Sequence, residues 1–201
     1  MLFNSPCRNK TVMNTHTRVI KLTHIKNFML FMIFTFIVMF KPAQAQEVAS
    51  KQWKENFQQM HLLGQGDFRW FGFHIYSAKL WSEQTKFIPA QRFALELTYK
   101  KSISKSRFTD SSIDEIKRIY KDQYSPATLQ QWRNYMDLAF IDVKAEDQLI
   151  GVYLPNIGLR FYSKDKLLAE IKDVEFAQAF FAIWLNPKTR DEELRQKLMG
   201  G

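Results

Sequence analysis

The chain has one cysteine, Cys7, which lies within the first 45 of its 201 residues. The same segment lacks aspartate and glutamate, although it carries six of the 29 lysines and arginines. The sequence beyond it therefore has no disulfide, thiolate nucleophile, cysteine-bound metal or lipid-anchoring cysteine. That part must be stabilised by burial alone, and about 150 residues suffice for one domain with its own core.

The formal charge of +9 at first favours a nucleic-acid partner. Outside the first 45 residues, however, 23 basic residues stand against 20 acidic ones, a balance of +3. This is an ordinary soluble surface. The basic excess therefore indicates export, and we expect no nucleic-acid partner.

The apolar run Phe28–Phe40 has thirteen residues and no charge, whereas a membrane-spanning helix needs about twenty. Basic residues precede it, and Pro42 and the small-x-small pattern Ala43-Gln44-Ala45 follow, which is the layout of a secretory signal. The expected division is residues 1–45 as a signal peptide cleaved after Ala45, 46–56 as a polar lead-in and 57–201 as one domain.

We accordingly expect the mature chain in the periplasm, with the membrane involved only during export. An uncleaved anchor is the alternative, and translation from Met13 is left open because the basic stretch is long for a signal.

The segment Leu62–Trp81 is rich in β-forming residues. Gly64 and Gly66 predict a tight turn with positive φ, followed by one long central strand covered on both faces. Alternation then puts Arg69 among Phe71, Phe73 and Ile75. Such a cation needs a partner, water or a ligand, so both a structural salt bridge and an anion site are open interpretations.

Hydrophobic periodicity predicts the remaining elements. Helices are expected from Phe108, with a Ser112–Glu115 capping box, from Pro126, and after Asp173. A short last helix follows a Thr189–Glu192 capping box. Strands are expected at 57–63, 92–100, 148–154, 159–163 and 167–171. This order predicts an α+β fold, an antiparallel sheet with helices on one face.

Catalytic and metal-binding motifs are missing from the sequence. Beyond residue 45 the histidines are His61 and His74, without metal-ligand spacing, and there is no HExxH, P-loop, nucleophile elbow or dinucleotide glycine pattern. His74 on a buried strand is expected to be a core histidine. We expect no metal and no cofactor, and the residue types alone identify no enzyme.

Several segments share their order and spacing with one known family. They are Gly64–Arg69, Ile75–Trp81, Phe93–Tyr99, Ser111–Ile116 and Phe176–Leu185 with Leu194-Arg195, which together span about residues 57 to 199. Taken in this order they resemble the chalcone isomerase-like superfamily, specifically its exported bacterial branch. The resemblance implies an open-faced β-sandwich, a curved antiparallel sheet with helices packed on one face. It also implies a ligand cleft between sheet and helices.

Site residues follow from the resemblance position by position. Arg69 is similar to the arginine that holds the phenolate in the plant enzymes, with one extra residue after the glycines. The strand threonine corresponds to Tyr76, and the tyrosine that opens the first helix to Phe108. The helix asparagine corresponds to Glu115, and the polar residue of the later helix to Ile183, beside Trp184. The expected ligand-binding residues are thus Arg69, Tyr76, Phe108, Glu115, Ile183 and Trp184.

These departures argue against flavonoid ring closure, because each lost donor of an anion site costs about 3 kcal/mol. The leading hypothesis is a non-catalytic domain that binds a small amphipathic anion, such as a fatty acid or phenolic acid, with Arg69 as the anchor. One alternative is an isomerase or intramolecular lyase with Arg69 as electrophile and Tyr76 as proton donor. Another is an interaction module without a ligand.

Overall fold

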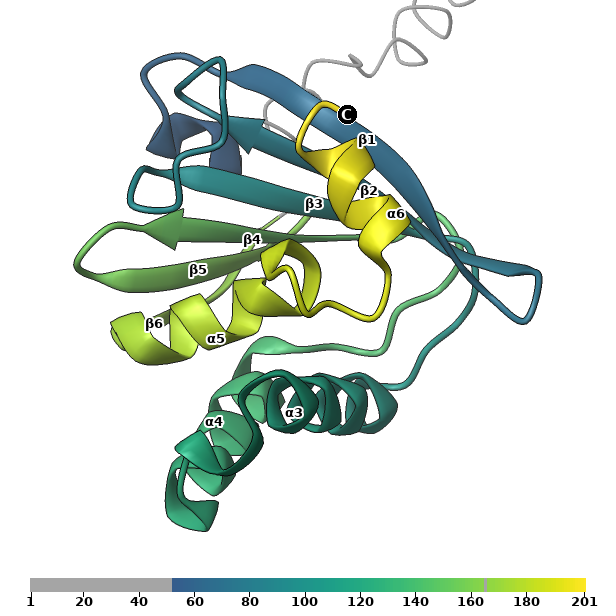
Figure 1. Cartoon of the computed structure of the whole chain (residues 1–201), viewed down its shortest axis with the longest axis vertical. Coiled ribbons are helices and arrows are strands. Elements are labelled where there is room, and N and C mark those ends of the chain that lie inside the picture. The colour runs from purple at the N-terminus through teal and green to yellow at the C-terminus, as the bar shows by residue number, and fades with distance from the viewer. Residues whose placement is uncertain (1–51, 165) are drawn as a thin grey trace, which may run out of the picture. The chain divides into compact units, whose positions relative to one another are not determined.

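The computed structural model describes residues 52–164 and 166–201, which form one sheet and its covering helices (Figure 1). The expected signal peptide and most of the lead-in lie outside the described residues. None of the helices described is both long and apolar enough to span a bilayer.

The sheet has six strands that pair in chain order, each antiparallel to the next. Its strands are β1 (His61–Trp70), β2 (Phe73–Ser82), β3 (Phe93–Tyr99), β4 (Gln148–Leu154), β5 (Gly158–Ser163) and β6 (Lys166–Ile171). Because successive strands pair, β1 and β6 are the edges and the connections alternate between the two ends of the sheet. The predicted α+β class, with an open curved antiparallel sheet, is confirmed.

The helices come from two parts of the chain. α3 (Lys105–Tyr120), η2 (Lys121–Gln123) and α4 (Pro126–Ala139) connect β3 to β4, and α5 (Val174–Leu185) and α6 (Glu192–Leu198) follow β6. α5 packs on β5 and α6 on β1 and β2, while α3 packs against α5 (Figure 1). The sheet face under α5 and α6 is called the inner face.

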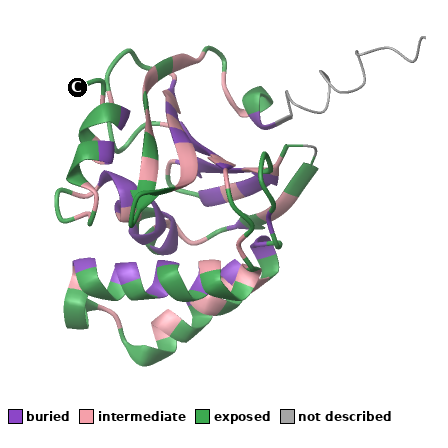
Figure 2. Ribbon diagram, turned by 90° about the vertical axis from the view of Figure 1, so that its right-hand side faces the viewer, coloured by how far each residue is buried: buried purple, intermediate pink, exposed green. Residues whose placement is uncertain are grey.

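The main core lies between the inner face and the helices. α3 and α4 place their buried residues toward the rest of the domain (Figure 2). β3 contributes alternate residues, Phe93, Leu95, Leu97 and Tyr99, as predicted for that strand. They meet apolar residues of α5, among them Phe176, Phe180 and Phe181.

The opposite, outer face carries a smaller cluster. Trp53, which is 4% exposed, lies in the 3₁₀ turn η1 (Gln52–Asn56) and packs with Ile150, Val152 and Leu154. The end of the expected lead-in is therefore folded onto the sheet.

The prediction of one long strand that follows the two glycines and continues to Trp81 is wrong. The chain reverses at Phe71-Gly72, and Trp70 pairs with Phe73 across this two-residue turn. β1 is consequently an edge strand and not a central one. The preceding strand begins at His61, not at Phe57.

Gly64 and Gly66 lie within β1 and do not form the predicted turn. Both face α6. A Cβ at Gly64 would lie 2.0 Å from the Lys197 carbonyl oxygen, and one at Gly66 would lie 2.8 Å from Leu194 Cδ1. The glycines therefore allow close packing of a helix on a strand.

Two helix starts also differ from the predictions. α3 begins earlier, with Ser104 as its N-cap, and the predicted cap Ser112 is buried inside the helix. α6 is capped by Asp191, whose carboxylate accepts a hydrogen bond from the Leu194 N–H at 2.9 Å. In both cases a suitable cap lay closer to the real start than the capping-box pattern.

Candidate functional site

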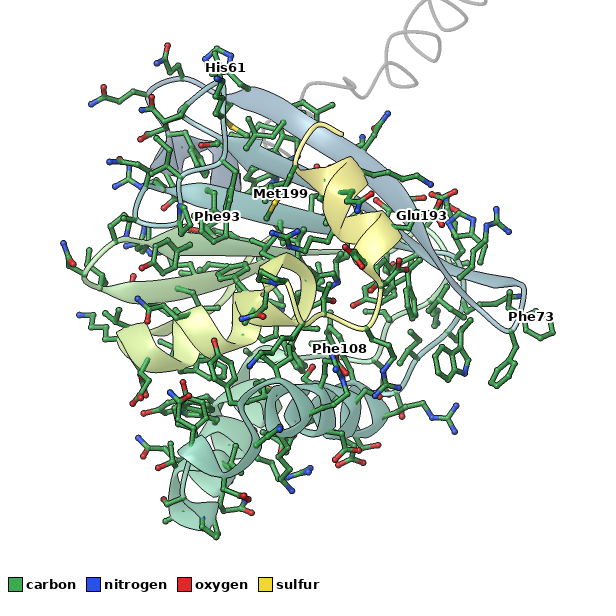
Figure 3. The ribbon with its side chains drawn as sticks, viewed as in Figure 1. His61, Phe73, Phe93, Phe108, Glu193 and Met199 are labelled. Atoms are coloured by element: carbon green, nitrogen blue, oxygen red, sulfur yellow. The ribbon has the colours of Figure 1, made fainter. Side chains whose placement is uncertain are left out.

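A group of aromatic side chains, Tyr76, Tyr99, Phe108 and Trp184, meets between the inner face and the helices; we call it the tyrosine cluster. Tyr76 of β2 and Tyr99 of β3 are register partners, with ring centroids 6.0 Å apart. Phe108 of α3 lies edge-on to Tyr99 at 5.9 Å, on the side of α3 that faces the sheet (Figure 3). The Trp184 indole N–H donates to Tyr76 Oη at 2.9 Å.

The two tyrosine hydroxyls are the polar atoms of this cluster that a ligand could use. Tyr76 Oη accepts the bond from Trp184, which leaves its own O–H available as a donor. Tyr99 is 1% exposed, and among the described residues its hydroxyl has no hydrogen-bond partner. An unsatisfied buried hydroxyl costs about 1–3 kcal/mol, so this one needs an explanation.

Both hydroxyls are held in the neutral form. Burial raises the pKa of Tyr76 far above its usual value, and the bond from Trp184 offsets only part of this effect. Burial likewise raises the pKa of Tyr99, with a smaller contribution from Tyr76. At neutral pH the pair can therefore donate hydrogen bonds to a carboxylate or carbonyl oxygen, but it cannot act as a base.

Glu115 lies beside the cluster and is already paired. Its carboxylate bonds Arg118 at 2.6 and 3.0 Å and lies 3.2 Å from the Arg190 guanidinium. Burial alone would raise the pKa of Glu115, but the two arginines outweigh it and hold the pKa below its usual value. This ion cluster joins α3 to the segment before α6, so the structure gives Glu115 a structural role.

Ile183 and Phe108 contribute apolar surface. Ile183 is half-buried at the margin of the core, and its carbonyl accepts the Thr189 hydroxyl at 2.6 Å. Phe108 stacks on Phe140 with centroids 4.4 Å apart. Four of the six expected positions, Tyr76, Phe108, Ile183 and Trp184, thus lie along the same sheet–helix interface.

Arg69 lies apart from this interface. Its neighbour Phe68 stacks on Tyr76 on the inner face, so Arg69 points to the outer face, where its side chain is 58% exposed. Its guanidinium is 3.9 Å from Asp67. A hydrogen bond from Ser77 is the largest cause of the lowered pKa of Asp67. The structure does not bring the expected anchor to the apolar cleft, because Arg69 follows the inward-facing Phe68 in an alternating strand.

The groove beside Arg69 is open and polar. It has a volume of about 810 Å³ and is lined by charged side chains of both signs, including Asp67, Lys79, Lys100, Glu193 and Lys197. Glu193 of α6 lies at its border beside β1 (Figure 3). Such walls suit a polar guest and offer little to an apolar tail.

The space between sheet and helices is almost filled. A void of about 10 Å³ lies among apolar side chains of β3 to β5 and α5, including Leu97, Phe161, Phe180 and Trp184. Such a void needs roughly 10–15 Å³ to hold one water molecule. The inner site is therefore closed in this structure.

Tyr99 is the potential ligand contact that sequence reasoning missed. Alternation predicts that Tyr99 shares a face with Phe93, Leu95 and Leu97, but it does not indicate a hydroxyl available to a ligand. Its register opposite Tyr76 was the missing signal, and register depends on tertiary structure. In the described residues there is no group of three or more potential metal ligands.

Comparisons with known proteins agree with this architecture. A model of the chalcone isomerase-like family matches residues 43–200. An uncharacterized protein of Haemophilus influenzae is 30% identical over 139 residues, which is 69% of this chain and 67% of that protein. Among solved structures, a fatty-acid binding protein of Arabidopsis thaliana superposes with a TM-score of 0.55 at 9% identity, covering 71% of this chain and 88% of that one. The last likeness shows the fold, and the first two show that this chain belongs to the chalcone isomerase-like family.

Proposed function

We propose that this protein is a non-catalytic binding protein that holds a small amphipathic anion, such as a fatty acid, between the sheet and the helices. The carboxylate would accept hydrogen bonds from Tyr76 and Tyr99, and the tail would lie along the apolar inner face. The observation that carries the proposal is the buried Tyr99 hydroxyl without a partner, beside a second hydroxyl whose proton is available.

The chemistry of the cluster favours binding over catalysis. Two neutral hydroxyls and an indole can hold an anion, but a proton transfer at neutral pH needs a group whose pKa lies near that pH. Glu115, the nearby carboxylate, is occupied by Arg118 and Arg190. The shared fold with a protein named as a fatty-acid binder also supports an amphipathic ligand.

Entry of a long tail requires the closed interior to open. The described void of about 10 Å³ is far too small for an alkyl chain. α3 and α4 form a separate layer that packs on α5 and β6, and its outward movement would widen the interior without breaking the sheet (Figure 1). We therefore expect ligand binding to change the protection of α3 and α4 against hydrogen exchange.

Titration of the delipidated protein with palmitate and decanoate, followed by native mass spectrometry, tests the proposal. We expect a one-to-one complex, and replacing Tyr76 or Tyr99 with Phe should weaken it about tenfold for each hydroxyl removed. Tyr162→Phe is the matched control, since Tyr162 is a buried tyrosine of the same sheet whose hydroxyl is bonded to Asn56 on the outer face. Absence of binding, or equal affinities for all variants, would contradict the proposal.

Export to the periplasm belongs to the same proposal and is supported by the layout of residues 1–45. Denaturing mass spectrometry of the protein recovered from the periplasm should give a chain that begins at Gln46. Recovery of the intact chain in the membrane fraction would favour an anchor.

A further inference from the structure

The β1–β2 hairpin extends beyond the rest of the sheet. The last register pair between β2 and β3 is Tyr76 with Tyr99, so the hairpin tip between Phe68 and Ile75 has no third strand beside it. Phe73 lies at the far end of this projection (Figure 3). An isolated pair of strands is marginally stable, so its extension needs a reason outside the core.

The tip carries three exposed aromatic side chains. Trp70 is 45% exposed, Phe73 64% and Phe71 85%. A soluble surface usually carries its large apolar residues singly, and three together at one tip indicate a contact with another phase or molecule. Trp is enriched at membrane–water interfaces, and Trp and Phe are residues that interfacial segments bury at the boundary between headgroups and acyl chains.

The turn keeps Phe71 in an unfavourable backbone conformation. Phe71 has φ +47° and Gly72 has φ +80°, the pattern of a two-residue turn that normally has Asn or Asp at its first position. A bulky residue in the left-handed region is strained, and here no burial of the ring compensates. Such a conflict between local preference and sequence is expected at functional sites.

Basic side chains lie beside the hairpin tip. Lys101 Nζ lies 5.8 Å from the Phe73 ring centre, and the Arg190 guanidinium lies 5.8 Å from that of Trp70. Arg69 adds an exposed guanidinium on β1. The hairpin's acid, Asp67, accepts a hydrogen bond from Ser77 at 2.8 Å. Arg190 pairs with Glu115, which leaves Arg69 and Lys101 as the exposed cations beside the tip. An apolar tip with exposed cations beside it is complementary to a bilayer with anionic headgroups.

We propose that the β1–β2 hairpin tip inserts Trp70, Phe71 and Phe73 into the interface of an anionic lipid bilayer, with Arg69 and Lys101 at the headgroups. The aromatic rings would reach the boundary between headgroups and acyl chains while β1 and β2 stay outside it. Trp70 stacks on Phe68, which in turn stacks on Tyr76. Insertion of the exposed rings requires no ligand in the tyrosine cluster, so the inference does not depend on the proposed function.

A fluorophore that senses polarity, attached at the tip of the full chain, tests the insertion. The background is Cys7→Ser, with a single new cysteine from either Phe73→Cys or Ile157→Cys. Ile157 is 46% exposed and lies in the β4–β5 turn, at the opposite end of the sheet. We expect vesicles of phosphatidylglycerol and phosphatidylcholine to shift the emission of the label at position 73 to the blue and to leave the label at 157 unchanged.

The comparison of the two labels separates the hairpin from the rest of the chain. Attachment through the first 45 residues alone would leave both labels in water, and non-specific adsorption would move both. Either result overturns the proposal, as would an unchanged emission at position 73. A response to pure phosphatidylcholine as strong as that to the anionic vesicles would overturn the headgroup role of the cations.

Variants in the labelled chain give the size of the effect. Phe71→Ser should raise the lipid concentration needed for half the shift about tenfold, because an inserted aromatic ring is lost. Arg69→Gln should raise it about fivefold with anionic vesicles. The control Leu138→Ser, at a residue of α4 that is 78% exposed, should change nothing. If the tip instead causes concentration-dependent dimers that Phe71→Ser abolishes, without any response to vesicles, the surface belongs to a second copy and the proposal fails.

Discussion

The two faces of the sheet differ in how their buried polar side chains are hydrogen-bonded. On the outer face Glu96 is 8% exposed and receives hydrogen bonds from Trp81 at 3.0 Å and from Gln148 at 3.2 Å. Tyr162 is likewise bonded, by Asn56 at 3.0 Å. On the inner face the equally buried Tyr99 hydroxyl has no partner among the described residues.

This difference distinguishes structural from functional polarity. Polar groups that are satisfied within the fold contribute to its stability, and a ligand would have to break their bonds in order to use them. A buried donor without a partner reduces stability until something accepts from it. On the outer side Arg92 Nε is also buried without a partner among the described residues, but the same guanidinium donates to the Asn56 carbonyl. The inner face therefore has a hydroxyl group with no hydrogen bond to any described residue, whereas the buried polar side chains of the outer face each make at least one.

The largest expected effect on stability concerns the packing of α6 on the inner face of β1. Gly64→Ala would place a methyl group against the α6 backbone at Lys197, and we expect it to lower the free energy of unfolding by about 3 kcal/mol or more. Gly72→Ala is the control, because its φ of +80° is unfavourable for alanine but its surroundings are empty, so it should cost about 1 kcal/mol. Urea denaturation measures both, and equal losses would show that α6 does not close tightly on β1.

The next largest effect on stability is expected from the ion cluster of Glu115, Arg118 and Arg190. Glu115→Gln removes a charge that faces Arg118 and Arg190 and should lower the free energy of unfolding by about 2 kcal/mol at neutral pH. The pKa of Glu115 is lower in the folded than in the unfolded chain, so its stabilisation is complete above the usual value of 4.5. It is lost as the pH falls through the folded-state pKa.

The difference in stability between the wild-type protein and Glu115→Gln should therefore shrink below pH 4.5. Glu193→Gln is the matched control, because Glu193 is fully exposed and its pairing with Lys197 is within α6. A constant difference at every pH would mean that the ion pairs do not stabilise the fold.

The sequence predicts much of this fold because periodicity is a local property. The strand predicted at 148–154 and the helix predicted after Asp173 correspond closely to β4 and α5. The sequence does not reveal the β1–β2 turn, because the residues on either side of it are apolar. The pattern of the two strands therefore resembles that of one continuous strand. Phe71 also replaces the usual Asn or Asp that marks such a turn.

The candidate site was predictable only in part. Resemblance places Tyr76 and Trp184 correctly at the sheet–helix interface, where they bond each other. Alternation along the sequence places Arg69 and Tyr76 on opposite faces, as in the structure, so the resemblance alone suggested Arg69 as the anchor in the cleft. Tyr99 is a candidate ligand contact because its hydroxyl has no hydrogen-bond partner among the described residues. A sequence cannot show which buried groups lack a partner.

Replacing Tyr162 or Tyr99 with Phe should change the free energy of unfolding by a smaller amount, and in opposite directions on the two faces. Tyr162→Phe breaks the bond to Asn56 and should lower the free energy of unfolding by about 1 kcal/mol. Tyr99→Phe removes an unsatisfied hydroxyl and should leave the stability of the ligand-free protein equal or raise it by up to about 1 kcal/mol. Thermal and urea unfolding of the delipidated variants measure this. A loss at Tyr99 as large as that at Tyr162 would show that the Tyr99 hydroxyl is satisfied in solution.

Arg69 gives the smallest expected effect on stability. Its side chain is 58% exposed and lies 3.9 Å from Asp67, so Arg69→Ala should change the free energy of unfolding by less than about 0.5 kcal/mol. Because Arg69 points to the outer face, the same variant should bind palmitate with wild-type affinity. A large loss of affinity in Arg69→Ala, together with full affinity in Tyr99→Phe, would indicate that the anion binds in the groove on the β1 edge. The unpaired hydroxyl on the inner face would then be a defect of packing without a role in binding.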